Sequence, residues 1–416
     1  MILKKNILLI CWDFPPNDGI GGRRWAKLAK GLQQHGYFLH VIKAEIPRGN
    51  NVSPWFKDVK NEHILLYELK PYWLKLWLND YTSLFSKIKI KIAQLALSIG
   101  FKGTIYDKAI GIQKRFLHLS KSIIEKNKID ELIVTGAPFN IIYYAALLKK
   151  EFPDLRIIAD YRDPWINSVN YGIAELSEKR LQEEKNKQDL VFKYADVITA
   201  PNEFLIEQIK ETHTGKSNSV QFKALPHFFD PDDFILSKPQ AKDPAMLKLV
   251  YAGALYNDSD RYLELLADAL LVLKKNYPEV AVQIDFYTNH TTKVFLNKGL
   301  NNSVRFLNPI GDKIFEVISN YDFSLILLAD HNKDFKTTKF FEFLPYRVPY
   351  LYVGPEGFVS NSIANEKLGY VLKSKQDLTD IYNNRLHKTE LSGFNSIAQH
   401  SLSAVVQKLI PLLKNN

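Results

Sequence analysis

The chain has 416 residues, more than one ordinary hydrophobic core accommodates. Its composition, with 46% hydrophobic and 24% charged residues, excludes an intrinsically disordered protein. Its single cysteine, Cys11, excludes an internal disulfide and a thiolate zinc cluster and favours a reducing compartment. The net charge of +10 is unevenly distributed, and no recognised nucleic-acid-binding motif accompanies it, so we do not expect a nucleic-acid partner.

The N-terminal segment predicts the start of a parallel α/β sheet. Residues 7–12 form an apolar run that reads as a strand, and the apolar residues before Asp13 are too few for a signal peptide or a membrane span. We therefore expect a cytoplasmic protein. A helix follows, opened by Gly21 and Gly22, and a second strand spans residues 38–43. The two glycines let phosphate or sugar oxygens approach a helix N-terminus. Arg23 and Arg24 add cationic donors to that loop, although lone arginines are more often solvated surface charges.

An insertion at about residues 70–128 carries most of the excess positive charge. Residues 71–128 contain eleven basic and three acidic side chains, with tryptophan, tyrosine and phenylalanine among them, a mixture that suits an anionic membrane surface. One helical face would carry Leu84, Ile88, Ile92, Leu95 and Ile99. The Lys-Ile alternation over residues 87–92 suits a strand equally well. Either the apolar face packs on its own domain, or the insertion makes peripheral contact with the inner face of a membrane.

Strands and helices continue to alternate through the first half of the chain. The predicted strands are 131–135, 156–160, 196–200 and 221–225, and the predicted helices are 141–150, 175–193 and 203–211. Ligands of open α/β sheets bind at the carboxyl ends of the strands, which is where Asp160, Arg162 and Asp163 fall. The alternative is a salt-bridged loop in which Arg162 pairs with its neighbours.

A proline-rich segment at 226–244 reads as an interdomain linker, and a second α/β series follows it. The elements predicted there are strands 247–252, 280–287 and 304–306 and helices 261–276 and 314–320. The last helical pattern, 397–413, is expected to pack back on the first domain. We therefore expect an N-terminal domain at 1–232, a C-terminal domain at 233–394 and a terminal helix at 395–416.

The stretch 330–357 joins two apolar runs that read as buried parallel strands. A short helix is predicted to begin at Thr337 or Thr338, which places Lys339 and Glu342 one turn apart near its N-terminus. Lys339 and the backbone amides would hold a phosphate, and Glu342 would accept hydrogen bonds from neutral hydroxyl groups such as those of a ribose. The alternative is a surface ion pair on a capped helix.

Seven motifs spread over almost the whole chain resemble those of the GT-B glycosyltransferases, most closely the family 4 type. They are FPPNDGIGGRRW, TGAPFNIIYY, DYRDPW, ADVITAPNEF, LPHFFDPDDF, LVYAGALY and KFFEFLPYRVPYLYVGPEG. The resemblance implies an α/β fold of two Rossmann-like domains facing an interdomain cleft. It also implies a UDP- or GDP-linked sugar donor on the C-terminal domain and a glycan or polyprenyl-linked acceptor on the N-terminal one. Enzymes of this type usually retain the anomeric configuration and use no metal or other cofactor.

The resemblance also assigns roles to residues of the second half. The family's acidic-x7-Glu motif matches Asp334 and Glu342, which implies a donor-sugar contact for Asp334 and a ribose contact for Glu342. Arg261 matches the basic residue that contacts the diphosphate, and Gly253 matches the glycine after the domain's first strand. The family arginine after that glycine is replaced by Ala254.

In the first half, Gly21 and Gly22 match the family's glycine loop near the donor phosphates and the acceptor. Asp160 or Asp163 would orient an acceptor hydroxyl or stabilise an oxocarbenium-like carbon. We expect a glycosyltransferase of cell-surface polysaccharide biosynthesis. A nucleotide-sugar epimerase on the same scaffold and a non-catalytic sugar-nucleotide-binding protein remain as alternatives, because a fold does not fix a function.

Overall fold

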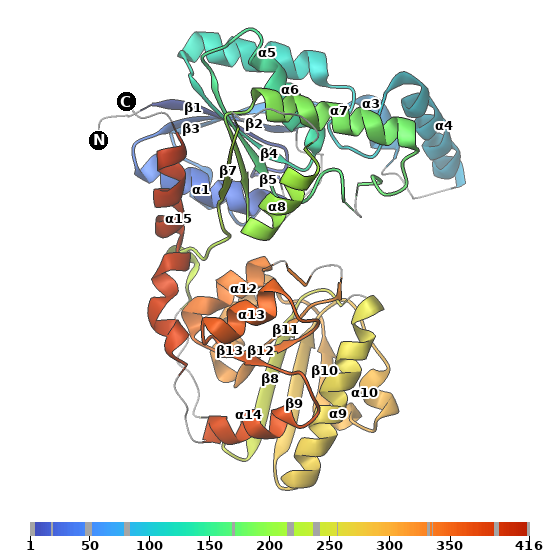
Figure 1. Ribbon diagram of the computed structural model, residues 1–416, viewed down its shortest axis with the longest axis vertical. Coiled ribbons are helices and arrows are strands. Elements are labelled where there is room, and N and C mark those ends of the chain that lie inside the picture. Colours follow the sequence, from blue (N-terminus) through green and yellow to red (C-terminus); the bar gives the residue numbers. More distant parts are fainter. Residues whose placement is uncertain are drawn as a thin grey trace. The chain divides into compact units, whose positions relative to one another are not determined.

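The computed structural model describes residues 5–17, 20–45, 52–78, 84–168, 171–213, 220–235, 242–255, 257–330, 333–334, 336–386 and 391–413. The chain forms two compact units, each with its own sheet (Figure 1). Unit 1 comprises Met1–Pro226 and Val405–Asn416, and unit 2 comprises His227–Ala404. The chain passes from one unit to the other inside the proline-rich segment and again within its last helix.

Unit 1 is built on a seven-stranded sheet with the order β3-β2-β1-β4-β5-β6-β7, in which all neighbouring strands are parallel. The strands are β1 (Asn6–Cys11), β2 (Phe38–Ala44), β3 (Ile64–Leu69), β4 (Glu131–Gly136), β5 (Arg156–Tyr161), β6 (Val197–Ala200) and β7 (Gln221–Ala224). The central strands are buried on both faces, which is why their sequences are nearly continuous apolar runs. All carboxyl ends therefore meet at one edge of the sheet.

Helices cover both faces of this sheet, with α1 on one face and α5 and α6 on the other (Figure 1). The helices of unit 1 are α1 (Arg23–Gln34), α2 (Phe56–Val59), α3 (Trp73–Trp77), α4 (Leu84–Gly100), α5 (Gln113–Asn127), α6 (Phe139–Leu148), α7 (Glu178–Tyr194) and α8 (Glu203–Glu211). The last helix, α15 (Leu402–Leu409), begins in unit 2 and ends in unit 1. Arg156 Nε donates to the Leu412 carbonyl at 2.7 Å, which ties the C-terminal segment to β5.

Unit 2 is built on a six-stranded parallel sheet with the order β10-β9-β8-β11-β12-β13. The strands are β8 (Met246–Ala252), β9 (Ala281–Tyr287), β10 (Val304–Leu307), β11 (Phe323–Leu327), β12 (Tyr350–Val353) and β13 (Gly369–Val371). The helices are α9 (Asp260–Asn276), α10 (Val294–Asn297), α11 (Ile314–Val317), α12 (Thr338–Phe343), α13 (Phe358–Asn365) and α14 (Asp377–Leu386). Separate apolar clusters lie beneath α9 and beneath α12 and α13.

The prediction of an α/β chain with two parallel sheets is confirmed. The strand alternative for residues 87–92 is wrong, because these residues lie in the 17-residue helix α4. Among the described helices, none combines the length and the apolar character needed to span a bilayer.

Candidate functional site

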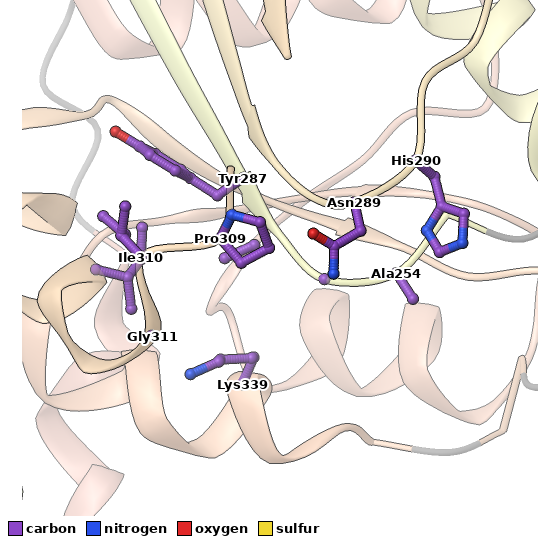
Figure 2. A pocket seen from close by; sticks show the side chains of 11 residues that line it. Ala254, Tyr287, Asn289, His290, Pro309, Ile310, Gly311 and Lys339 are labelled. Carbon is purple, nitrogen blue, oxygen red and sulfur yellow. The ribbon is translucent and has the colours of Figure 1, made fainter. Parts of the chain in front are cut away.

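A pocket of about 240 Å³ opens at the carboxyl edge of the sheet in unit 2 (Figure 2). The residues that line it come from the ends of β8, β9 and β10 and from α11 and α12: Ala252, Gly253, Ala254, Tyr287, Asn289, His290, Pro309, Ile310, Gly311, Ile314 and Lys339. Most of this lining is apolar, with an amide, an imidazole and one cation among it. Such a surface suits a flat ring system that carries a negatively charged group at one end.

The wall formed by β8 and β9 is fixed by two hydrogen bonds. The Gly253 amide donates to the Tyr287 carbonyl at 3.3 Å, and the Tyr251 hydroxyl donates to the Ala254 carbonyl at 2.6 Å. A Cβ on Gly253 would lie 2.8 Å from the Tyr251 hydroxyl, closer than real Cβ atoms approach. A side chain at this position would therefore require the Tyr251 ring to shift, and Gly253 itself lines the pocket.

Lys339 is the cation of the pocket. Thr337 caps α12, as predicted, by accepting a hydrogen bond from the Phe340 amide. Lys339 Nζ lies 2.9 Å from Glu342 Oε2 and 4.8 Å from the centre of the Phe315 ring, and about a third of the side chain is exposed. Figure 2 shows Lys339 on one side of the pocket and Tyr287 on the other. Because α12 has only six residues, the charge of Lys339 matters more for an anion than the helix dipole does.

Glu342 is buried behind Lys339, with only 7% of its side chain exposed. The ion pair anticipated as the alternative interpretation therefore forms, but it is not a surface pair, since the carboxylate lies in the protein interior. Glu342 does not itself line the pocket. Glu342 lies one helical turn from Lys339, which does line the pocket. A ligand that replaced Glu342 as the partner of Lys339 would therefore change the contacts of Glu342 directly.

Asp334 and Arg261 lie outside the lining of this pocket. Asp334 is buried, and its Oδ1 accepts a hydrogen bond from the Phe358 amide at 2.7 Å, which caps the start of α13. A Cβ on Gly357 would lie 2.7 Å from that oxygen, so the glycine permits the contact. Arg261 is exposed near the start of α9, where it pairs with Asp330.

In unit 1, Gly21 and Gly22 pack closely against other residues of the same unit. A Cβ on Gly22 would lie 2.1 Å from the Asp13 carbonyl, and one on Gly21 would lie 2.6 Å from Arg162 Nη1. The Arg162 guanidinium donates to the carbonyls of Gly21, Ala137 and Gly136, the last at 3.0 Å. The alternative that Arg162 pairs with neighbouring carboxylates is wrong in this form, because its hydrogen-bond partners are backbone carbonyls.

Asp160 lies at the end of β5 and is completely buried. Its carboxylate accepts hydrogen bonds from Trp25 Nε1 at 2.7 Å, Thr199 Oγ1 at 2.8 Å, Thr135 Oγ1 at 3.1 Å and the Arg24 guanidinium at 3.4 Å. Burial alone raises the pKa of Asp160, but the Arg24 charge and the hydrogen bonds from Trp25 and Thr199 outweigh it and hold that pKa below its usual value. The alternative of solvated arginines is wrong for both Arg23 and Arg24, which are 5% and 4% exposed. In this arrangement Asp160 presents no surface to an acceptor.

Asp163 and Asp13 lie at the same edge and are more accessible. Asp163 accepts a hydrogen bond from the Tyr171 hydroxyl at 3.0 Å, and burial together with the Asp163 charge raises the pKa of Tyr171. Asp13 pairs with Lys108 of the insertion at 3.2 Å and is 23% exposed. Asp13 was not among the predicted candidate residues, although it follows the first strand as Asp163 follows β5.

The sequence also missed the part of the pocket that follows β9 and β10. Asn289 and His290 come shortly after the end of β9, and Pro309 to Gly311 come shortly after β10. The rule that ligands bind at carboxyl ends of parallel strands would have indicated both loops. Among the residues that the structure describes, no three His, Cys, Asp or Glu side chains are grouped so as to hold a metal ion.

The sequence matches no protein-family model and no curated protein. Solved structures are similar to the chain over nearly its whole length, at low identity. A structure described as trehalose-6-phosphate from E. coli bound with UDP-2-fluoro glucose has a TM-score of 0.63 and 11% identity, with 98% of each chain covered. Sucrose-phosphate synthase from Thermosynechococcus elongatus has a TM-score of 0.58 and 12% identity, again with 98% of each chain covered.

A lipopolysaccharide outer core galactosyltransferase, WaaB, has a TM-score of 0.56 and 11% identity, with 98% of this chain and 99% of that chain covered. These similarities concern the fold, since identities near 11% do not carry activity from one chain to another. The two parallel sheets and the full-length similarity together show that the chain has the GT-B fold of glycosyltransferases.

Proposed function

We propose that this protein is a glycosyltransferase that moves a sugar from a UDP- or GDP-linked donor to a glycan or polyprenyl-linked acceptor. The observation that carries the proposal is the pocket at the carboxyl edge of unit 2, with Lys339 on its wall and Glu342 paired to Lys339 at 2.9 Å. The cytoplasmic location and the role in cell-surface polysaccharide biosynthesis belong to the same proposal.

The pocket suits the nucleotide part of the donor. Its apolar walls match the faces of a base, and Asn289 offers both hydrogen-bond donor and acceptor atoms to the edge of the base. The pocket is smaller than the ~300–1,000 Å³ typical of sites that enclose a whole ligand, so it would hold the nucleoside and leave the sugar outside. Lys339 would then contact the diphosphate.

Donor binding would rearrange the ion pair on α12. A diphosphate beside Lys339 competes with Glu342 for the ammonium group, because both are anions. Glu342, released from that contact, would accept hydrogen bonds from the ribose hydroxyls one turn away. Arg261 would add a second cation on exchanging Asp330 for phosphate. Asp334 would act through the start of α13, which it caps and which faces the donor sugar in this proposal.

The proposed transfer retains the anomeric configuration and uses no metal. The bond between the anomeric carbon and the diphosphate oxygen breaks, and the bond to the acceptor oxygen forms on the same face of the sugar. The acceptor proton passes to the departing phosphate oxygen, and the nucleoside diphosphate leaves. Negative charge builds on that oxygen, and Lys339 would stabilise it. Asp163 at the edge of unit 1 is the carboxylate proposed to orient the acceptor, with Asp160 supporting the loop.

A screen of nucleotide sugars for release of nucleoside diphosphate tests the proposal. We expect one UDP- or GDP-sugar to be turned over by the wild type and the rate at subsaturating donor to fall about 10- to 100-fold in Glu342→Ala, the range for a lost charge-assisted hydrogen bond. Glu279→Ala is the matched control, because Glu279 is exposed at the opposite end of the sheet.

Two outcomes would contradict the proposal. Conversion of the donor to its epimer without acceptor would indicate an epimerase. Nucleotide binding with no turnover of any nucleotide sugar in the presence of glycan and polyprenyl-phosphate acceptors would indicate a binding protein. Unchanged turnover in Glu342→Ala would remove Glu342 from the site.

A further inference from the structure

Helix α4 exposes a continuous apolar stripe to solvent. The stripe consists of Phe85, Ile88, Ile92, Leu95 and Ile99, whose exposed fractions are 76, 57, 52, 63 and 79%. The spacing of three and four residues places all five side chains along one face of the helix. Scattered exposed apolar residues are ordinary, but a contiguous row of large ones on a single helix marks a contact surface.

The helix packs on unit 1 through a different face. Ala93 and Leu97 are fully buried and form an apolar cluster with Leu74 and Leu78 from the region of α3. At about 100° per residue, this buried face lies roughly opposite the exposed stripe. Packing within the domain therefore leaves the stripe uncovered, which contradicts the alternative in which this apolar face packs on its own domain.

Three exposed lysines border the stripe. Lys87, Lys89 and Lys91 lie between the buried face and the exposed one, with Lys89 on one flank and Lys87 and Lys91 on the other. No acidic residue occurs anywhere in α4. Long lysine side chains beside an apolar face can reach phosphate groups while the apolar residues enter the acyl region.

The helix is held firmly at its C-terminal end. The Arg180 guanidinium donates to the carbonyls of Phe101 and Gly103, at 3.4 Å and 2.7 Å, and also to that of Ser98. These contacts join the end of α4 to α7. The stripe is thus presented by a fixed element of unit 1.

We propose that α4 docks flat on the surface of an anionic lipid bilayer, with the apolar stripe at the boundary of headgroups and acyl chains and the lysines on lipid phosphates. Charge favours lipid over a second copy of the chain, because a symmetric pairing of two α4 helices would set lysines against lysines with no acid to balance them. This docking is independent of nucleotide-sugar chemistry and would hold for any activity of unit 2.

Vesicle flotation tests the proposal, with phosphatidylcholine vesicles that either contain or lack phosphatidylglycerol. The wild type is expected to float with the anionic vesicles only. Ile92→Ser combined with Leu95→Ser is expected to weaken binding by about 100-fold or more, because each side chain would lose its transfer from water. The matched control combines Leu271→Ser with Leu296→Ser, two exposed leucines of unit 2. Thermal unfolding verifies that all variants are folded.

The charge is tested separately. Combined Lys87→Gln, Lys89→Gln and Lys91→Gln is expected to weaken binding about 100-fold at low salt, since each basic residue near an anionic surface contributes a factor of about five. Combined Lys275→Gln, Lys293→Gln and Lys375→Gln makes the same charge change on exposed lysines of unit 2 and is expected to bind as the wild type does.

Three results would overturn the proposal. The wild type could fail to float with anionic vesicles, or the Ile92→Ser/Leu95→Ser protein could float as the wild type does. Sedimentation without lipid could also show a dimer that this pair of substitutions dissociates, which would assign the stripe to a second copy of the chain.

Discussion

The two sheets carry charged residues at the same edge, yet use them in opposite ways. In unit 1, Asp160 at the end of β5 is completely buried and held by four side chains. In unit 2, Lys339 follows β11 at the corresponding edge, and a third of its side chain remains exposed on the wall of a pocket. A charged residue at a carboxyl edge can therefore belong to the framework or to the binding surface, and burial together with the number of hydrogen-bond partners separates the two.

The difference has a physical cause. A buried carboxylate is stable only when its charge and its lone pairs are all compensated, and Asp160 meets that condition through Arg24, Trp25 and two threonines. A residue that must exchange a partner for a ligand has to keep some access to solvent. Lys339 has that access, and its single carboxylate partner can be replaced by a phosphate.

The largest effect is expected from removing the charge of the framework acid. Asp160→Asn would leave the buried Arg24 guanidinium without its negatively charged partner, with only the carbonyls of Leu225 and Pro226 as acceptors, and lower the free energy of unfolding of unit 1 by about 3–5 kcal/mol. Urea unfolding followed by tryptophan fluorescence measures this loss, because Trp25 is buried beside the carboxylate. Asp154→Asn, at an exposed position, is the control. An unchanged unfolding midpoint with abolished turnover would instead make Asp160 a residue of the chemistry.

A smaller effect on stability and a larger one on binding are expected for the cation of unit 2. Lys339→Met would keep most of the side-chain volume and weaken binding of UDP or GDP by about 10- to 100-fold, as expected for a lost charge-assisted hydrogen bond. Calorimetric titration measures the affinity, with Lys275→Met as a control at an exposed position. Equal affinities of Lys339→Met and wild type would show that the diphosphate lies elsewhere.

The smallest effect concerns a second framework acid, this time in unit 2. Glu366 is contacted by Lys336 at 2.9 Å, by His400 at 3.3 Å and by Ser362. Burial raises its pKa, but the hydrogen bonds from His400, Ser362 and Lys336 outweigh burial and lower it to about 2. The pKa in the unfolded chain is about 4.3, so this contribution to stability is complete above that pH and is lost as the pH falls towards 2.

The unfolding midpoint of unit 2 is therefore expected to depend less on pH in Glu366→Gln than in the wild type between about pH 4.3 and pH 2. The midpoints of the two proteins are expected to differ most above about pH 4.3 and least near pH 2. Unfolding followed by circular dichroism over this range gives the comparison. Parallel pH profiles of Glu366→Gln and wild type would mean that the low pKa does not contribute to stability.

The sequence indicated the fold because most strands of a doubly covered parallel sheet are apolar runs. The predicted strand at 131–135 and the observed β4 nearly coincide, and α8 has the predicted bounds. The sequence did not decide between a helix and a strand at α4, because the Lys-Ile alternation over residues 87–92 is short. Which face of α4 is exposed depends on its packing with α3, and a sequence does not display that packing.

The candidate site was predicted less completely than the fold. Gly253 and Lys339 line the pocket, but Asn289 and His290 lie on loops without a distinctive motif. The framework role of Asp160 depends on Arg24, which is 136 residues away in the chain. Contacts at that separation follow from the way α1 packs on the sheet, and the local pattern around either residue does not contain them.

The proposed function requires that the pocket at the carboxyl edge of unit 2 holds the nucleotide of a sugar donor. Titration of UDP and GDP against Ala254→Trp tests it most directly, because Ala254 is exposed at the pocket wall and an indole there would fill the space without disturbing the core. Ala364→Trp, at an exposed position of α13, is the control. We predict that Ala254→Trp abolishes the binding seen with wild type and Ala364→Trp, whereas wild-type affinity in Ala254→Trp would show that the nucleotide does not bind in this pocket.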